Sequence, residues 1–304
     1  MKFSFIIPFK DRCYLCLRCI DSILELVYNN QAEIILIDDG SSYSNDLVKI
    51  YSLSEKYQNV TIIKNKISTG PGVSRNLGID KAKGDFIVFV DSDDFIESSF
   101  FEKNNLNPNV DVYFTTTQTL NSNGIVGYYY KIDNDLVSSD DYIKHISSFH
   151  QFFAPVWGKI YNRDFLLKNK IRFNKEFRYY EDSYFNIMCI FEYRAHTKCI
   201  SNGFYTYVLD NTDSISKKVN LKMLENCYQY IQYFLSIMHC DNTKLISDYL
   251  YNLLIILNNY GLYNENLNFF RSAYVEIRNK TNWTLKQKIK MLIRYYCSYI
   301  RRKK

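Results

Sequence analysis

The stretch Gly84–Asp94, GDFIVFVDSDD, decides the fold of this chain. An uninterrupted apolar run, FIVFV, is followed at once by Asp91, Asp93 and Asp94. Short apolar runs rich in β-branched residues are typical of strands that are buried on both faces of a parallel sheet. Ligands bind beyond the carboxyl ends of such strands. The three carboxylates are therefore predicted to lie at the ligand-binding edge of a sheet.

The residues before this stretch repeat a strand and helix pattern. Further apolar runs of strand length occupy residues 3–8, 33–38 and 60–65. Segments with helical periodicity lie between them, at residues 15–27, 46–56 and 73–81. Strands that alternate with amphipathic helices predict an α/β fold, in which a mostly parallel sheet carries helices on both faces.

The regular alternation of strand and helix signals ends after Asp94. Turn signals lie at residues 107–109 and 121–124, helix signals at 138–148 and 164–170, and a short strand signal at 205–208. From about residue 216 the pattern is helical almost to the end. We predict that residues 1–95 and 96–216 are the two halves of one domain and that residues 217–304 form a helical C-terminal region.

Positive charge is concentrated at the C-terminal end. The chain has 304 residues and a net charge of +6. Ten basic residues and no acidic ones lie between 278 and 304, so the rest of the chain is acidic and nucleic acid is not an expected partner. Apolar residues recur among these charges at helical spacing. The segment fits an amphipathic helix at an anionic membrane surface, and it equally fits a helix packed on the protein with a solvated basic face.

Other features of the chain favour a location inside the cell. The first residues lack the features of a secretion signal, and no apolar stretch reaches the length of a membrane span. The eight cysteines are then expected to be reduced. Cys13, Cys16 and Cys19 share one face of a predicted helix, and the next cysteine is Cys189, so we expect buried thiols rather than a metal cluster.

Carboxylates follow two strands at the same predicted edge. Asp91 and Asp93 form a D-x-D motif after one strand, and Asp38–Asp39 follows another. Clustered carboxylates repel one another unless a cation neutralises them, and Mg²⁺ and Mn²⁺ readily share carboxylate ligands with substrate phosphates. The chain has no P-loop and no G-x-G-x-x-G after its first strand, which disfavours NTPase and dinucleotide-binding functions.

Several motifs in order resemble one enzyme family. They are IIPFKDR, ILIDDGSS, GPGVSRNLGIDKAKGDFIVFVDSDD, VWGKIYNRDFLLKNKIRF and YYEDSYFN. Together they resemble family 2 glycosyltransferases of the GT-A fold, of the bacterial surface-polysaccharide type. The resemblance covers about residues 3–216.

The resemblance implies a role for each matching residue. Uracil and diphosphate contacts fall to Pro8, Asp11, Asp39 and Arg75, with Asp39 on the base. Asp91 is implied to contact the ribose, and Asp93 to bind the metal that bridges the donor phosphates. Asp182 is implied to be the general base, with Glu181 beside it and Trp157 and Lys159 close to the site.

These residues suit an inverting transfer from a UDP-sugar with Mn²⁺ or Mg²⁺. A carboxylate base takes the acceptor proton, and a divalent ion stabilises the leaving diphosphate. We expect a glycan or lipid-linked saccharide acceptor, used in O-antigen or capsule assembly at the cytoplasmic membrane face. A sugar nucleotidylyltransferase and a non-catalytic nucleotide-sugar-binding scaffold at the membrane are the alternatives.

Overall fold

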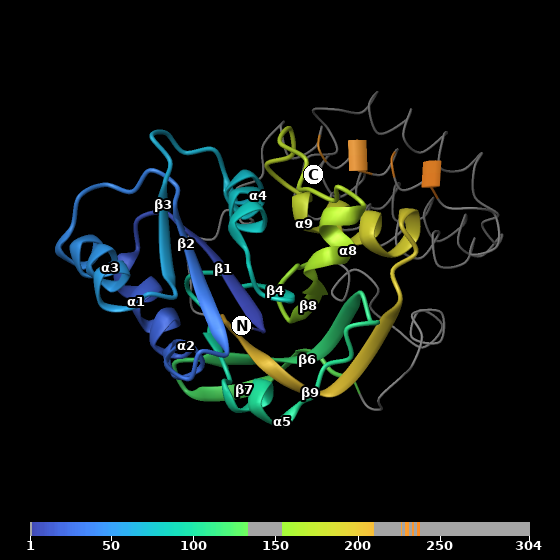
Figure 1. Ribbon diagram of the computed structural model, residues 1–304, viewed down its shortest axis with the longest axis horizontal. Helices are drawn as coiled ribbons and strands as arrows, with labels where there is room; N and C mark the ends of the chain where they lie inside the picture. The colour runs from blue at the N-terminus through green and yellow to red at the C-terminus, as the bar shows by residue number, and fades with distance from the viewer. Residues whose placement is uncertain are drawn as a thin grey trace, which may run out of the picture. The chain divides into compact units, whose positions relative to one another are not determined.

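The computed structural model describes residues 2–132 and 154–209, with single helical positions between 226 and 237. Contacts divide the chain into two compact units, residues 1–146 with 151–218, and residues 147–150 with 219–304. The first unit holds the sheet (Figure 1). The predicted helix at 138–148, most of the predicted helical region and the basic tail lie outside the described residues.

The N-terminal half is a parallel, doubly covered sheet, as predicted. Its strands, in spatial order, are β3 (Val60–Lys64), β2 (Ala32–Asp38), β1 (Phe3–Phe9) and β4 (Phe86–Phe89). Its helices are α1 (Cys13–Asp21), α2 (Leu24–Tyr28), α3 (Asn45–Lys56) and α4 (Pro71–Lys81). Figure 1 shows α1, α2 and α3 on one side of these strands and α4 on the other.

One predicted helix is in fact two. The periodic segment 15–27 contains α1 and α2, which are separated at Ser22 and Ile23. The Ser22 hydroxyl donates to the Cys19 carbonyl at 2.6 Å, a local bond that competes with continuation of the helix. Periodicity cannot reveal this break, because the apolar positions stay in phase across it.

The second half extends the sheet with strands of mixed direction. They are β5 (Phe95–Ile96), β6 (Val112–Asn121), β7 (Gly124–Tyr130), β8 (Lys159–Asn162) and β9 (Thr197–Val208). Beyond β4 the order is β8, β6, β9 and β5, and β7 pairs with β6. The predicted turn at 121–124 joins β6 to β7. The sequence predicted only the last four residues of β9 and missed β8.

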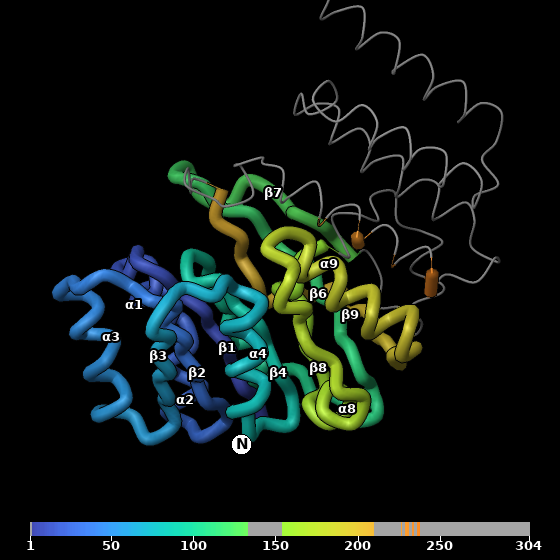
Figure 2. Tube along the Cα trace, turned by 90° about the horizontal axis from the view of Figure 1, so that it is seen from above, coloured from blue at the N-terminus to red at the C-terminus, as the bar shows by residue number. Residues whose placement is uncertain are grey.

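Short helices complete this half. They are α5 (Ser99–Lys103), α8 (Arg163–Lys168) and α9 (Glu181–Ile187), which continues into the π-helical turn η1 (Met188–Glu192). The view from above in Figure 2 shows α8 and α9 on the far side of β4 from α1 and α3.

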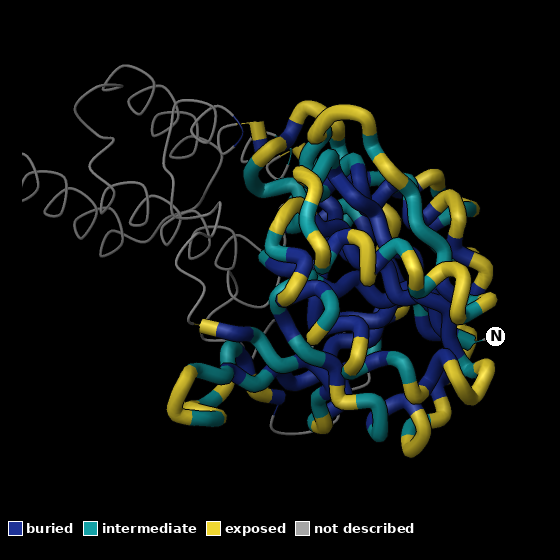
Figure 3. Tube along the Cα trace, turned by 90° about the vertical axis from the view of Figure 1, so that its left-hand side faces the viewer, coloured by how far each residue is buried: buried dark blue, intermediate teal, exposed yellow. Residues whose placement is uncertain are grey.

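The core lies along the central strands (Figure 3). Every residue of β1, β2 and β4 is buried. Cys13, Cys16 and Cys19 are buried free thiols on α1, as expected from their spacing. Burial raises the pKa of the Cys16 and Cys19 thiols, which keeps them neutral. Within the described part of the chain, no helix is long and apolar enough to cross a membrane.

Helix α4 packs unusually close to β1 because Gly78 has no side chain. A Cβ atom at this position would lie 2.3 Å from Ile6 Cγ2. Non-bonded carbon atoms do not approach so closely, so a larger residue at position 78 requires Ile6 or α4 to shift. This close packing sets the distance between the sheet edge and the residues that α4 presents to it.

We predict that Gly78→Ala destabilises the protein by about 1–3 kcal/mol, although alanine is the better helix former. The measurement is urea unfolding in wild-type and Ile6→Ala backgrounds. Since Ile6→Ala removes the clashing methyl group, Gly78→Ala should lower the free energy of unfolding by clearly less in the Ile6→Ala background. An equal decrease in both backgrounds would contradict the close contact.

Candidate active site

The first acidic turn, after β2, is dominated by the buried side chain of Asp39. It is 5% exposed and accepts six hydrogen bonds from residues 65–74. The donors are the side chains of Asn65, Ser68, Thr69 and Ser74 and the backbone N–H groups of Thr69 and Gly70. Asp39 therefore fastens the loop that leads into α4 to the end of β2.

These hydrogen bonds keep Asp39 ionised. Burial alone acts to raise its pKa, but the donors of Thr69, Asn65, Ser68 and Gly70 outweigh burial and lower the pKa to about 2. A carboxylate with this lowered pKa stays charged across the neutral range and there holds the residue 65–70 loop.

Pro8 and Asp11 mark the end of β1 beside this turn. Pro8 is buried within the strand, whereas Asp11 is exposed and has a positive φ of 52°. The Asp11 N–H donates to Ser41 Oγ at 2.8 Å, and Asp11 Oδ1 accepts from the Ser42 N–H at 2.9 Å. The loops after β1 and β2 are thus tied together at the sheet edge.

The first two carboxylates after β4 pair with different arginines. Asp91 Oδ1 accepts from Arg75 Nη2 at 2.8 Å, and Asp93 Oδ2 lies 3.3 Å from Arg12 Nη1. Both aspartates remain partly exposed, with side-chain exposures of 34% and 25%. Burial and the nearby Asp91 charge raise the pKa of Asp93, against the opposing effect of Arg12 and Arg18.

The third carboxylate, Asp94, has turned into the protein. It is 1% exposed and accepts hydrogen bonds from the Tyr205 hydroxyl at 2.6 Å and the Val208 N–H at 2.9 Å. The Tyr205 hydroxyl also accepts from the Asp91 N–H at 3.1 Å. Asp94 therefore fixes the loop after β4 to β9 and is not directed to a ligand.

Asp91 and Asp93 fit a divalent cation that is shared with a ligand. No group of three His, Cys, Asp or Glu side chains in the described residues is arranged to hold a metal ion. Mg²⁺ in nucleotide sites needs fewer protein ligands, since it commonly takes one or two carboxylates and completes its shell with phosphates and water. The partial exposure of Asp93 and its raised pKa beside Asp91 match such a site.

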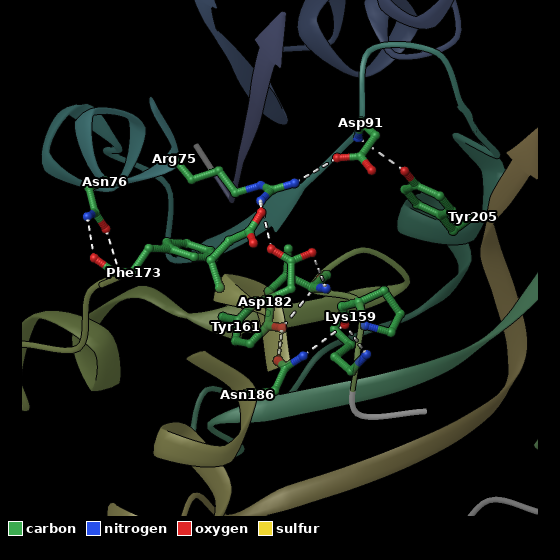
Figure 4. A network of polar contacts seen from close by, with 12 residues as sticks. Arg75, Asn76, Asp91, Lys159, Tyr161, Phe173, Asp182, Asn186 and Tyr205 are labelled. Carbon is green, nitrogen blue, oxygen red and sulfur yellow. Dashed lines mark hydrogen bonds and ion pairs between the residues drawn. The ribbon is translucent and has the colours of Figure 1, made fainter. Parts of the chain in front are cut away.

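A single guanidinium connects this edge to α9 (Figure 4). Arg75, on α4, donates from Nη2 to Asp91 and from Nη1 to Asp182 Oδ1 at 2.7 Å. Glu181 Oε1 lies farther from Nη1, at 3.9 Å. The other oxygen of Asp182 accepts from the Val156 N–H at 3.3 Å. Residues 107 positions apart in the sequence thereby meet at one point.

The neighbouring carboxylates Glu181 and Asp182 both have raised pKa values, but different groups oppose the rise. Burial and the Asp182 charge raise the pKa of Glu181 to about 8, so Glu181 is protonated at neutral pH. Burial also raises the pKa of Asp182, but Arg75, the Val156 N–H and Lys159 oppose that rise. Two carboxyl groups with separated pKa values can serve different chemical roles.

Trp157 and Lys159 follow Val156, whose N–H donates to Asp182. Trp157 stacks on Tyr205 and Tyr207, and its ring centroid lies 5.1 Å from the centroid of each tyrosine ring. Lys159 is fully buried and donates to the Pro155 carbonyl at 2.5 Å. Burial lowers the pKa of Lys159 to about 7, while the Asp182 charge opposes the shift.

The structure thus brings Arg75, Asp91, Asp182 and Glu181 into one network and places Asp93 next to it. Pro8, Asp11 and Asp39 lie along the adjacent strand ends. Tyr205 is the functional residue that the sequence did not suggest. A signal was available, since Tyr205 and Tyr207 are two apart on a strand and so share one face, which here stacks on Trp157.

Sequence comparison relates the N-terminal part of the chain to a known family. Residues 4–104 match Glycosyl transferase family 2. The poly(ribitol-phosphate) beta-glucosyltransferase of Bacillus spizizenii is 28% identical over 300 residues, which are 93% of this chain and 43% of the relative. The glycosyltransferase EpsJ of Bacillus subtilis is 26% identical over 70% of this chain and 62% of its own length. The chain spans less than two thirds of either relative.

Structural comparison identifies the fold as GT-A. The crystal structure of residues 1–349 of S. aureus TarS in complex with UDP-GlcNAc superposes with a TM-score of 0.66 and 20% identity. The match covers 82% of this chain and 72% of that one. The mostly parallel sheet with its extension of mixed direction is thus shared with TarS.

We predict that Asp39→Asn lowers the free energy of unfolding by roughly 2 kcal/mol at neutral pH, because its hydrogen-bond donors then face an uncharged group. The depressed pKa of Asp39 means that its contribution is complete above pH 4 and is lost as the pH falls towards 2. Urea unfolding of both proteins should therefore converge in that interval. A difference that stays constant down to pH 2 contradicts the prediction.

Proposed function

We propose that this chain, a family 2 glycosyltransferase by sequence and fold, moves a sugar from a UDP-sugar onto a glycan or lipid-linked saccharide acceptor. One observation carries the proposal, namely that Arg75 joins the Asp91 edge of the sheet to Asp182. Two comparisons support it. The B. spizizenii relative is named a glucosyltransferase, and TarS, which shares the fold, is known in complex with UDP-GlcNAc.

Asp182 is the proposed general base. As the acceptor oxygen bonds to the anomeric carbon, Asp182 takes the hydroxyl proton, and the bond from that carbon to the diphosphate breaks to release UDP. The raised pKa of Asp182 makes it a stronger base than an ordinary aspartate. Because this scheme has one base and no enzyme nucleophile, it proceeds by single displacement with inversion.

The donor is proposed to lie along the ends of β1, β2 and β4. Pro8, Asp11 and Asp39 line the side assigned to uracil, and Asp91 the side assigned to ribose. Asp93 would hold Mn²⁺ or Mg²⁺, which supplies Lewis-acid stabilisation of the leaving diphosphate. The partly exposed carboxylates of Asp91 and Asp93 support this assignment.

The acceptor side is proposed to include Trp157, Lys159 and Glu181. Glu181 is protonated at neutral pH and can donate a hydrogen bond to an acceptor oxygen. The relative's name, which includes poly(ribitol-phosphate), supports a surface polymer as the product. Contact of residues 278–304 with the inner membrane surface is part of the proposal and rests on their basic amphipathic sequence.

We predict that Asp182→Asn lowers kcat by about 10²–10⁴-fold, because asparagine cannot accept the acceptor proton. UDP affinity should stay within about threefold of wild type, since Asp182 acts on the acceptor. The measurement is UDP release from a panel of UDP-sugars with acceptor present, together with calorimetric titration of UDP.

Glu181→Gln is the matched control. Glutamine resembles the protonated glutamic acid in shape and charge, so this variant should keep activity within about tenfold of wild type near neutral pH. The reverse pattern, with an active Asp182→Asn and an inactive Glu181→Gln, would move the base to Glu181. Wild-type protein that releases no UDP from any sugar donor would refute the proposed function.

We also predict that activity is lost in EDTA and restored by Mn²⁺ or Mg²⁺. Asp93→Asn should raise the Mn²⁺ concentration for half-maximal activity by about tenfold or more, because a neutral amide is a poorer ligand for a hard cation. Arg12→Lys, which keeps the charge beside Asp93, is the control. Activity that persists in EDTA excludes the metal.

A further inference from the structure

Arg75 is buried at the centre of the network. Its side chain is 4% exposed, and both terminal nitrogens are engaged by carboxylates, at 2.8 Å from Asp91 and 2.7 Å from Asp182. Its guanidinium carbon lies 5.5 Å from the centre of the Phe173 ring. Its Nε is buried without a hydrogen-bond partner. Arg75 thus donates a hydrogen bond to each of the two carboxylates, whereas its Nε–H group donates none.

Neighbouring residues of α4 fix the position from which Arg75 reaches out. Asn76 exchanges two hydrogen bonds of 2.8 Å with the backbone of Phe173, one as donor and one as acceptor. A Cβ atom on Gly72 would lie 3.4 Å from Glu181 Cγ. Helix α4 is therefore held against the segment that leads into α9, and Arg75 has no freedom to swing towards solvent.

We propose that Arg75 is a positioning residue for the transfer reaction, which bridges Asp91 to Asp182 so that the base stays ionised and in register with the donor edge. This inference rests on the proposed function. It gives Arg75 a role different from the uracil and diphosphate contact that the family resemblance implies. The Arg75 side chain is only 4% exposed, so a direct phosphate contact would require the residues around the guanidinium to move apart.

The charges around Asp182 determine the direction in which its pKa shifts when the charge of Arg75 is removed. Its side chain faces the charged or titratable groups of Arg75 on α4, Asp91 after β4, Lys159 on β8 and Glu181 on α9. Burial raises the pKa of Asp182, Arg75 and Lys159 lower it, and Asp91 raises it. Loss of the Arg75 charge removes the contribution that most strongly favours the ionised base. The pKa of Asp182 then rises, and activity on the acid side is lost at a higher pH.

The test compares Arg75→Met and Arg75→Lys by the pH dependence of kcat at saturating UDP-sugar and metal. For Arg75→Met the acid limb should move to higher pH by about one unit or more, the size of shift that a close opposite charge produces. At neutral pH kcat should fall at least about tenfold. Arg75→Lys keeps the charge but cannot bridge both carboxylates, so its acid limb should stay near that of wild type while kcat falls by less.

Calorimetric titration of UDP distinguishes positioning from direct donor binding. We expect the UDP dissociation constant to stay within about threefold of wild type in both variants, because the buried guanidinium is directed to Asp91 and Asp182 rather than to solvent. A loss of UDP affinity of tenfold or more, with an unmoved acid limb, would overturn the inference in favour of a donor contact. Where Arg75→Met does not fold, Arg75→Lys decides between the same two outcomes through kcat and UDP affinity.

Asn76→Ala is the structural control. It removes the link from α4 to Phe173 without changing any charge, so it should lower the melting temperature and leave the acid limb in place. A shift of the acid limb in Asn76→Ala equal to that in Arg75→Met shows that loosened packing suffices and overturns the inference. Failure of the proposed function is separate, because wild-type protein would then release no UDP in the same assay.

Discussion

The burial of charge at the carboxyl edge of the sheet is the constraint on which this site depends. An ionised group removed from water is costly unless partners replace its hydration. Each buried charge here meets that condition in its own way. Asp39 collects donors from residues 65–74, and Arg75 balances Asp91 and Asp182. The carboxyl group of Asp94 is buried as well, and burial together with the Asp91 and Asp93 charges raises its pKa well above the ordinary value. The partners come from both halves of the domain, so the same contacts that neutralise the charges also assemble the site.

Much of the fold can be predicted from local sequence because its signals are local. The strands β1 to β4 are short apolar runs, and the glycine and proline at positions 70 and 71 precede or begin α4. The strands of the second half cannot be predicted in this way. Strand β8 is short and antiparallel to β4, and most of β9 lacks a clear alternation. Their strand character comes from pairing with distant residues, which composition and periodicity do not encode.

The candidate site shows the same division. Its carboxylates can be found from the strand ends they follow, but the direction in which each one points cannot. Asp91, Asp93 and Asp94 invite the expectation of one shared cation, yet in the structure they face Arg75, Arg12 and Tyr205. Asp94 meets Tyr205 across 111 residues of sequence, and its burial removes it from ligand binding. The local sequence therefore predicts where the acidic edge lies. The direction in which each aspartate points depends on partners that are distant in the sequence.

The adjacent residues Glu181 and Asp182 show how long-range contacts distinguish two groups of the same chemistry. The two residues are adjacent and bear the same functional group, so sequence distinguishes them only by resemblance to a motif. The structure distinguishes them physically, since Arg75 lies 2.7 Å from Asp182 and 3.9 Å from Glu181. Burial and the Asp182 charge raise the pKa of Glu181 to about 8, whereas Arg75 is the main group that opposes the rise in the pKa of Asp182. In the proposed mechanism, these two equivalent groups serve as a base and a hydrogen-bond donor, and they differ in their distance to one cation. That distance is set by α4, whose approach to β1 depends on the missing side chain of Gly78.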